Sequence, residues 1–171
     1  KTTDVDLTIR EKANNQIEVI GQLNTELSFL SLNNGKLETI MNHCGCSRGG
    51  YYVLAILGPG QEPTNHALRD IATLSSDFEK WGQRIILLFH DKEQSKKFRA
   101  SDFPGLPSTI SYGIDENGTI QKELAKALKL QNGTLLPIFI IANTNNDIIF
   151  KSQGYTIGLG EQLMNEIKLL K

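Results

Sequence analysis

The two cysteines of the sequence, Cys44 and Cys46, are separated by one glycine. Residues two apart can place their α-carbons within the disulfide range of about 4.4–6.8 Å, and so small a ring would be strained and readily reduced. The alternative, which we favour, is two thiols in a polar loop, because the pair precedes an expected strand and no helix start lowers a thiol pKa there. The neighbouring His43 adds a third potential ligand, but the spacing is poor and a second half-site is missing, so we expect no metal site.

A second group with chemical potential is Glu62, His66 and Arg69, whose spacing places them on one face of a helix. A carboxylate and an imidazole on one face can act as acid and base. The structural interpretation is that Glu62 complements the helix dipole, Thr64 caps the helix and His66 lies on the surface. We favour it because no nucleophile is nearby.

These residues follow an expected central strand at 51–57, where seven apolar residues end at Gly58-Pro59-Gly60. An amphipathic helix is predicted from Thr64 to Trp81. Strands then alternate with helices, which indicates an α/β protein. Before the central strand we expect two strands within 1–20, a hairpin turning at 33–35 and a polar loop at 41–50; after the helix we expect strands at 84–90, 109–115, 136–141 and 148–151, and helices at 92–100, 119–130 and 158–171.

Length and charge narrow the class of protein. The chain has 171 residues, which suits one domain, and its net charge is -1 with 18 basic and 19 acidic residues. This balance gives no electrostatic case for binding nucleic acid or an anionic membrane. No apolar run is long enough to cross a bilayer and no signal peptide is present. Because the chain starts at Lys1, we expect it to be part of a longer protein.

The strand, turn and helix at 51–81 resemble the first βα unit of the thioredoxin fold, whose turn normally carries Cys-x-x-Cys. When Pro63 is matched to the proline of that motif, Gln61 and Thr64 occupy the cysteine positions, with Glu62 and Pro63 between them. The stretch LLPIFIIANTNNDIIFKSQGY resembles the family's second half. The resemblance implies that the Leu136–Pro137 bond is cis and faces the turn.

A wider resemblance covers the whole chain. The stretches KTTDVDLTIRE, GQEPTNHALRDIA, FPGLPSTISYGID and SQGYTIGLGEQLM resemble the C-terminal thioredoxin-like domain of secreted bacterial transglutaminase-like proteins. This implies a thioredoxin-like domain at 21–171, with a central mixed sheet flanked by helices and an N-terminal β-hairpin extension. Residues 1–20 would be strands that link to or complete a preceding domain. A secreted or periplasmic location follows from the same resemblance.

The functional expectation is a redox-inactive accessory domain, because neither Gln61 nor Thr64 can form a thiolate. Its partners would be other domains of the same polypeptide or an extended peptide held beside Pro137 by strand addition. We expect no cofactor, no nucleic acid partner and no membrane insertion within this sequence. One alternative is a thiol–disulfide oxidoreductase that uses Cys44 and Cys46; another is a scaffold whose groove is occluded.

Overall fold

The computed structural model describes residues 17–24, 26–44, 50–131 and 135–170. Within these ranges eight strands form one mixed sheet. The three strands that follow one another through helical connections are parallel, and the others pair antiparallel. In spatial order the strands are β1 (Gly21–Gln22), β8 (Asp147–Gln153), β7 (Ile138–Asn143), β4 (Tyr51–Leu57), β5 (Ile85–Phe89), β6 (Ile110–Ile114), β2 (Ser28–Ser31) and β3 (Leu37–Thr39).

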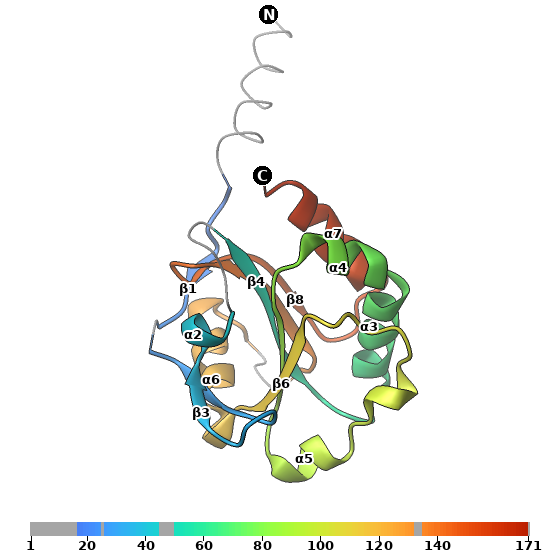
Figure 1. Cartoon of the computed structure of the whole chain (residues 1–171). Helices are drawn as coiled ribbons and strands as arrows, with labels where there is room; N and C mark the ends of the chain where they lie inside the picture. Colours follow the sequence, from blue (N-terminus) through green and yellow to red (C-terminus); the bar gives the residue numbers. More distant parts are fainter. Residues whose placement is uncertain (1–16, 25, 45–49, 132–134, 171) are drawn as a thin grey trace, which may run out of the picture.

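Helices cover both faces of this sheet (Figure 1). One face carries α3 (Glu62–Thr73), α4 (Ser75–Trp81) and α7 (Leu159–Lys168), and the other carries α2 (Ile40–Cys44) and α6 (Thr119–Ala127). The short helix α5 (Lys92–Lys96) follows β5 at the edge where the parallel strands end. None of the helices in the described ranges combines the length and the apolar character needed to cross a membrane.

Strand β4 supplies side chains to two separate cores. Val53, Ala55 and Leu57 belong to the core beneath α3, α4 and α7, whereas Tyr52 and its alternate neighbours belong to the core beneath α6. Successive side chains of a strand point to opposite faces, so a strand covered on both sides must be apolar throughout. This explains why the predicted strand at 51–57 is an uninterrupted apolar run.

The element order agrees with the sequence prediction, with several local differences. The predicted helix 92–100 ends at Lys96, and strand β1 was not predicted. The predicted helix 64–81 begins at Glu62 and is interrupted at Leu74, where two serines with low helix propensity follow. The predicted loop at 41–50 begins instead with helix α2. Of the strands expected within 1–20, residues 1–16 lie outside the described residues, and 17–20 are irregular chain whose Ile20 N–H donates to Ile148 O at 2.8 Å.

Candidate functional site

The turn between β4 and α3 lies at the edge where the parallel strands end. Gly60 has a φ of +79°, which favours glycine, and the Gln61 N–H donates to Gly58 O at 3.1 Å. A Cβ atom on Gly58 would lie 2.6 Å from Gln61 Oε1, so the amide of Gln61 lies directly over this glycine. Gln61 is the extended N-cap residue of α3, and its side chain is exposed.

Thr64, one helical turn after the exposed Gln61, is buried. Its side chain is only 1% exposed, and its Oγ1 accepts a hydrogen bond from the Gly58 N–H at 2.9 Å. The prediction that Thr64 caps the helix is therefore wrong: Gln61 holds the N-cap position, and its side chain makes no capping hydrogen bond. The hydroxyl satisfies the main chain of the turn instead, because the buried N–H of Gly58 would otherwise lack a partner. The residues between, Glu62 and Pro63, form the first turn of α3.

The second predicted feature is the segment that enters β7. The Leu136–Pro137 peptide bond is cis, in agreement with the expectation from the thioredoxin resemblance. The carbonyl of Pro137 accepts a hydrogen bond from the Gly154 N–H at 2.9 Å, which ties this segment to the end of β8. Within the described residues, the main chain of Leu136 has no hydrogen-bond partner.

These two features meet in a cavity of about 260 Å³, which we call the central groove. Its lining combines two leucines with three amide side chains and one imidazole, so it offers neutral hydrogen-bond donors and acceptors beside an apolar surface. The residues are Leu57, Gly58, Gln61, His90, Gln94, Gln121 and Leu136. The structure therefore brings Gln61 and Leu136 into one cavity, whereas Pro137, which was expected to face the turn, is buried and is not among the lining residues.

Three groove residues were not identified from the sequence. His90 follows β5, Gln94 belongs to α5 and Gln121 to the first turn of α6. Their common signal is a polar residue placed just after a parallel strand, or at the start of the helix that follows it, where α/β proteins place their binding residues. That signal was present in the sequence for His90, which directly follows a buried apolar strand.

A buried carboxylate lies behind the groove. Asp115 is fully buried at the end of β6, and its two oxygens accept hydrogen bonds from the Ile120 and Gln121 N–H groups at 2.8 and 2.9 Å. Burial raises the pKa of this carboxyl, while those two hydrogen bonds and the nearby His90 act in the opposite direction. Asp115 thus holds the start of α6, and with it Gln121, in place.

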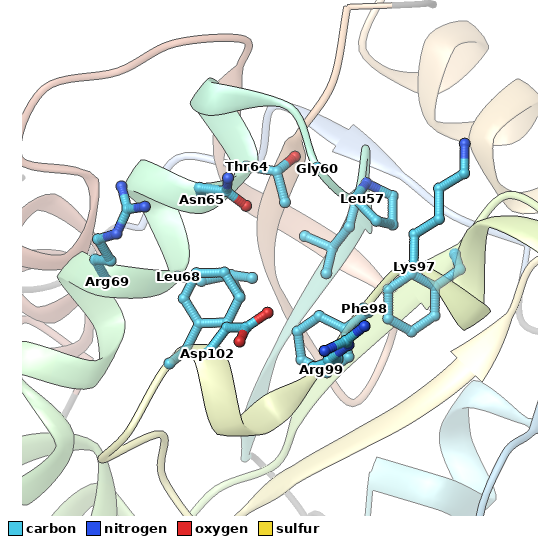
Figure 2. A pocket seen from close by; sticks show the side chains of 13 residues that line it. Leu57, Gly60, Thr64, Asn65, Leu68, Arg69, Lys97, Phe98, Arg99 and Asp102 are labelled. Carbon is cyan, nitrogen blue, oxygen red and sulfur yellow. The ribbon is translucent and has the colours of Figure 1, made fainter.

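A second cavity, of about 240 Å³, lies on the other side of the β4–α3 turn (Figure 2). It is enclosed by the turn, the first half of α3 and the segment 97–103, and it shares only Leu57 with the central groove. We call it the aromatic cavity, because Phe89, Phe98 and Phe103 line it.

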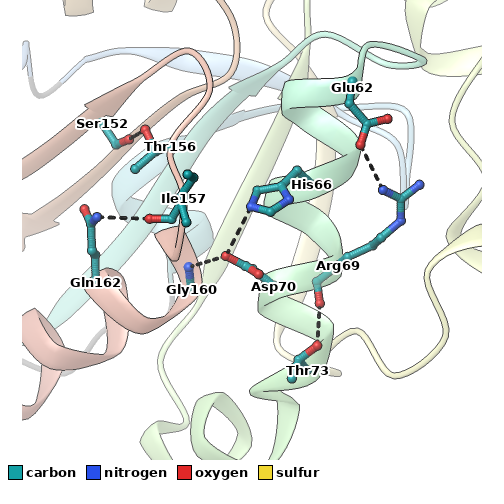
Figure 3. A network of polar contacts seen from close by, with 10 residues as sticks. All are labelled: Glu62, His66, Arg69, Asp70, Thr73, Ser152, Thr156, Ile157, Gly160 and Gln162. Carbon is teal, nitrogen blue, oxygen red and sulfur yellow. Dashed lines mark hydrogen bonds and ion pairs between the residues drawn. The ribbon is translucent and has the colours of Figure 1, made fainter.

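The three residues that could form an acid–base group make two separate sets of contacts (Figure 3). They are Glu62, His66 and Arg69. Arg69 Nη1 lies 3.2 Å from Glu62 Oε1 in an exposed ion pair. His66 stacks on Tyr155, with ring centroids 4.9 Å apart, and its Nε2 lies 3.9 Å from Asp70 Oδ2. The His66 side chain therefore packs from α3 against the loop after β8, and it is more enclosed than the surface residue that was predicted.

Only one cysteine of the pair lies within the described residues. Cys44 is the last residue of α2, and Cys46 lies outside the described residues. The thiol pair therefore stays a prediction. In the part of the chain that the structure describes, no three His, Cys, Asp or Glu side chains come together in a way that suits a metal ion.

Comparisons with known proteins define the fold. No protein-family model matches the chain, and no curated protein matches it. Solved structures do: a putative thiol:disulfide interchange protein DsbE from Chlorobium tepidum has a TM-score of 0.63 at 11% identity, covering 91% of this chain and 100% of that one. Peroxiredoxin Q from Xanthomonas campestris has a TM-score of 0.62 at 14% identity, covering 90% and 99%.

An uncharacterised thioredoxin-like protein from Porphyromonas gingivalis, known from its solution structure, has a TM-score of 0.61 at 21% identity, covering 90% of this chain and 94% of that one. At these identities the likeness concerns the fold alone. The chain has a thioredoxin-like fold, and the fold class predicted from the sequence is confirmed.

Proposed function

We propose that this chain is a redox-inactive thioredoxin-like accessory domain that binds an extended protein segment in the central groove. The observation that carries the proposal is the meeting of two features in one groove. Gln61 belongs to a turn without cysteine, and across the groove the main chain of Leu136 has no hydrogen-bond partner within the described residues. Main-chain donors and acceptors that are left without partners bind extended peptides in the manner of strand addition, which requires no thiol.

The larger context of the domain is part of the same proposal. The resemblance to transglutaminase-like proteins supports an accessory role in a secreted or periplasmic protein, with residues 1–20 joining the preceding domain. The bound segment would then come from another domain of that polypeptide or from a separate protein. The amide groups of Gln61 and Gln94 suit such a ligand, because they can pair with its main chain as donors or acceptors.

The test begins with selection of peptides from a random library on the immobilised protein, followed by calorimetry on the enriched peptides. Gln61→Arg introduces a longer side chain into the groove, and we expect affinity to fall at least tenfold. The matched control is Gln83→Arg, which makes the same change before β5, outside the residues that line the groove. Equal affinities of the two variants and the wild type would exclude the groove as the binding site.

A second arm separates main-chain binding from side-chain binding. N-methylation of one peptide bond at a time in an enriched peptide removes single N–H donors. If the peptide adds to the Leu136 main chain, one such substitution should weaken binding about twofold to twelvefold, since each hydrogen bond contributes roughly 0.5–1.5 kcal/mol. Uniform tolerance of N-methylation would contradict strand addition.

The thiol alternative has its own assay. Reduction of insulin by dithiothreitol is measured with the wild type and with the Cys44→Ser/Cys46→Ser variant. We expect both proteins to match the rate of dithiothreitol alone. Catalysis by the wild type that is lost in the variant would establish the cysteine pair as a redox centre and overturn the redox-inactive assignment.

A further inference from the structure

The aromatic cavity has a built apolar floor. Leu68 and Phe89 are fully buried, and Phe103 is 7% exposed. Phe98 stacks on Phe103 with a centroid distance of 5.9 Å and an interplanar angle of 7°, and it lies 5.3 Å from Phe89. Since an apolar cavity of about 150 Å³ holds one benzene molecule, a cavity of about 240 Å³ accommodates a ring with a short side chain.

Charged and polar side chains surround the opening. Lys97, Arg99 and Asp102 are exposed there, and Asn65 is half-buried. None of these four side chains has a hydrogen bond or ion pair within the described residues. The other cation, Arg69, is directed away from the centre of the cavity, as Figure 2 shows, and is paired with Glu62.

The rim therefore carries two uncommitted cations against one carboxylate. A guanidinium such as that of Arg99 presents a planar fork that matches a carboxylate, and the amide of Asn65 adds a neutral donor. The N-cap residue of α3, Gln61, makes no side-chain hydrogen bond to the helix start, so the positive end of the helix dipole also favours an anion beside the cavity, although the Glu62 carboxylate offsets part of this. Floor and rim together fit an apolar body that ends in an anion.

We propose that the aromatic cavity binds a small organic monocarboxylate with an aromatic or branched apolar body. The body contacts Phe98 and Phe103 above the buried Phe89, and the carboxylate lies at the rim near Arg99 and Asn65. Asp102 opposes the ligand by like-charge repulsion. The proposal is independent of peptide binding in the central groove, because the two sites share only Leu57.

The test uses 3-phenylpropanoate as the probe, titrated into the isotopically labelled chain and followed by two-dimensional amide NMR at low ionic strength. We expect shifts concentrated in 59–69 and 97–103, with a dissociation constant on the order of a millimolar, typical for a ligand of this size. The uncharged analogue 3-phenylpropanamide, which keeps the same body, should bind at least threefold more weakly.

Two exposed substitutions should move the affinity in opposite directions. Arg99→Gln should weaken 3-phenylpropanoate about threefold to fivefold, and Asp102→Asn should strengthen it by a similar factor, as expected for exposed charges at low salt. Lys80→Gln on α4 is the control, because it removes one positive charge, as Arg99→Gln does, at a position outside the cavity. Neither Arg99→Gln nor Asp102→Asn should change the affinity for 3-phenylpropanamide.

Three results would overturn the proposal: shifts that do not include 97–103, equal binding of the acid and the amide, or an Asp102→Asn effect of the same sign as that of Arg99→Gln. Opposite effects confined to the charged probe would establish the site, whatever the outcome of the peptide experiments.

Discussion

Restoring the two missing thiols tests whether the β4–α3 turn keeps the geometry of a thioredoxin-like site. The variant is Gln61→Cys/Thr64→Cys in a Cys44→Ser/Cys46→Ser background. Position 61 is exposed at the N-cap of α3 with φ −88° and ψ 142°, and position 64 is buried one turn later. An exposed nucleophile followed by a buried partner is the arrangement that disulfide exchange needs, so we expect the variant to close an intramolecular disulfide and to accelerate insulin reduction.

The magnitude follows from the helix start. A thiol at such a position in a Cys-x-x-Cys motif has a pKa of about 7, against about 8.5 for a free cysteine. At pH 7 the thiolate fraction then rises from about 3% to about 50%, roughly 16-fold. The lower pKa also makes each thiolate less nucleophilic. With a Brønsted coefficient of about 0.5, the rate per thiolate falls roughly sixfold. The net expectation is about threefold faster reaction with a disulfide reagent than a free thiol.

The stability cost is modest. Thr64→Cys replaces the hydroxyl that accepts the Gly58 N–H by a weaker sulfur acceptor, a loss of roughly 0.5–1.5 kcal/mol. The matched control is the single Gln61→Cys variant, which keeps the reactive position but cannot form the disulfide and should not turn over insulin. A folded double variant that forms no disulfide and leaves the dithiothreitol rate unchanged would refute the assignment of Gln61 and Thr64 to the two cysteine positions.

Three further substitutions test interactions elsewhere in the fold. Tyr52→Phe removes the buried hydrogen bond of 2.6 Å to Asn146 Oδ1, and the free energy of unfolding in urea should fall by about 1–3 kcal/mol; an unchanged midpoint would contradict this. Hydrogen bonds from the Ser108 N–H and hydroxyl lower the pKa of Glu79, so its stabilisation is present above pH ~4.5 and is lost at lower pH. Thermal unfolding should show the wild type losing stability relative to Glu79→Gln as the pH falls from about 5 to 3. Burial raises the pKa of Asp115, so the sign reverses: the wild type should gain stability relative to Asp115→Asn as the pH falls from 7 towards 4, and a constant difference would refute it.

The sequence was sufficient to predict those elements whose apolar pattern follows directly from their burial. Strand β4 is covered on both faces, which leaves an unbroken apolar run, and the chain must turn at Gly58-Pro59-Gly60. The break at Leu74 was not foreseeable from periodicity, because Phe78 and Trp81 continue the apolar stripe of α3 into α4. An apolar stripe shows which side of a helix faces the core, but it does not show where the helix is interrupted.

The error at Thr64 has a different physical origin. A threonine near a helix start can cap the helix or satisfy the preceding turn, and the sequence does not distinguish these roles. The choice depends on which residue has extended dihedrals at the N-cap, and that residue is Gln61. With Thr64 placed inward, its Oγ1 lies 2.9 Å from the Gly58 nitrogen, and the N-cap residue Gln61 makes no capping hydrogen bond with its side chain.

The composition of the central groove depends on a non-local property of the sheet. Gln61, His90 and Gln121 follow three different strands, and they meet only because parallel strands end at one edge. The sequence shows each polar residue after its strand, but the lateral order of the strands, which decides the neighbours, is a tertiary choice. The same reasoning separates the two cavities: Leu57 ends the central strand, so the turn that follows it divides the edge into a groove rich in amides and a cavity lined by aromatic rings. A peptide main chain and an apolar carboxylate are therefore expected on opposite sides of one turn, and substitutions at Gln61 and at Arg99 should affect their ligands independently.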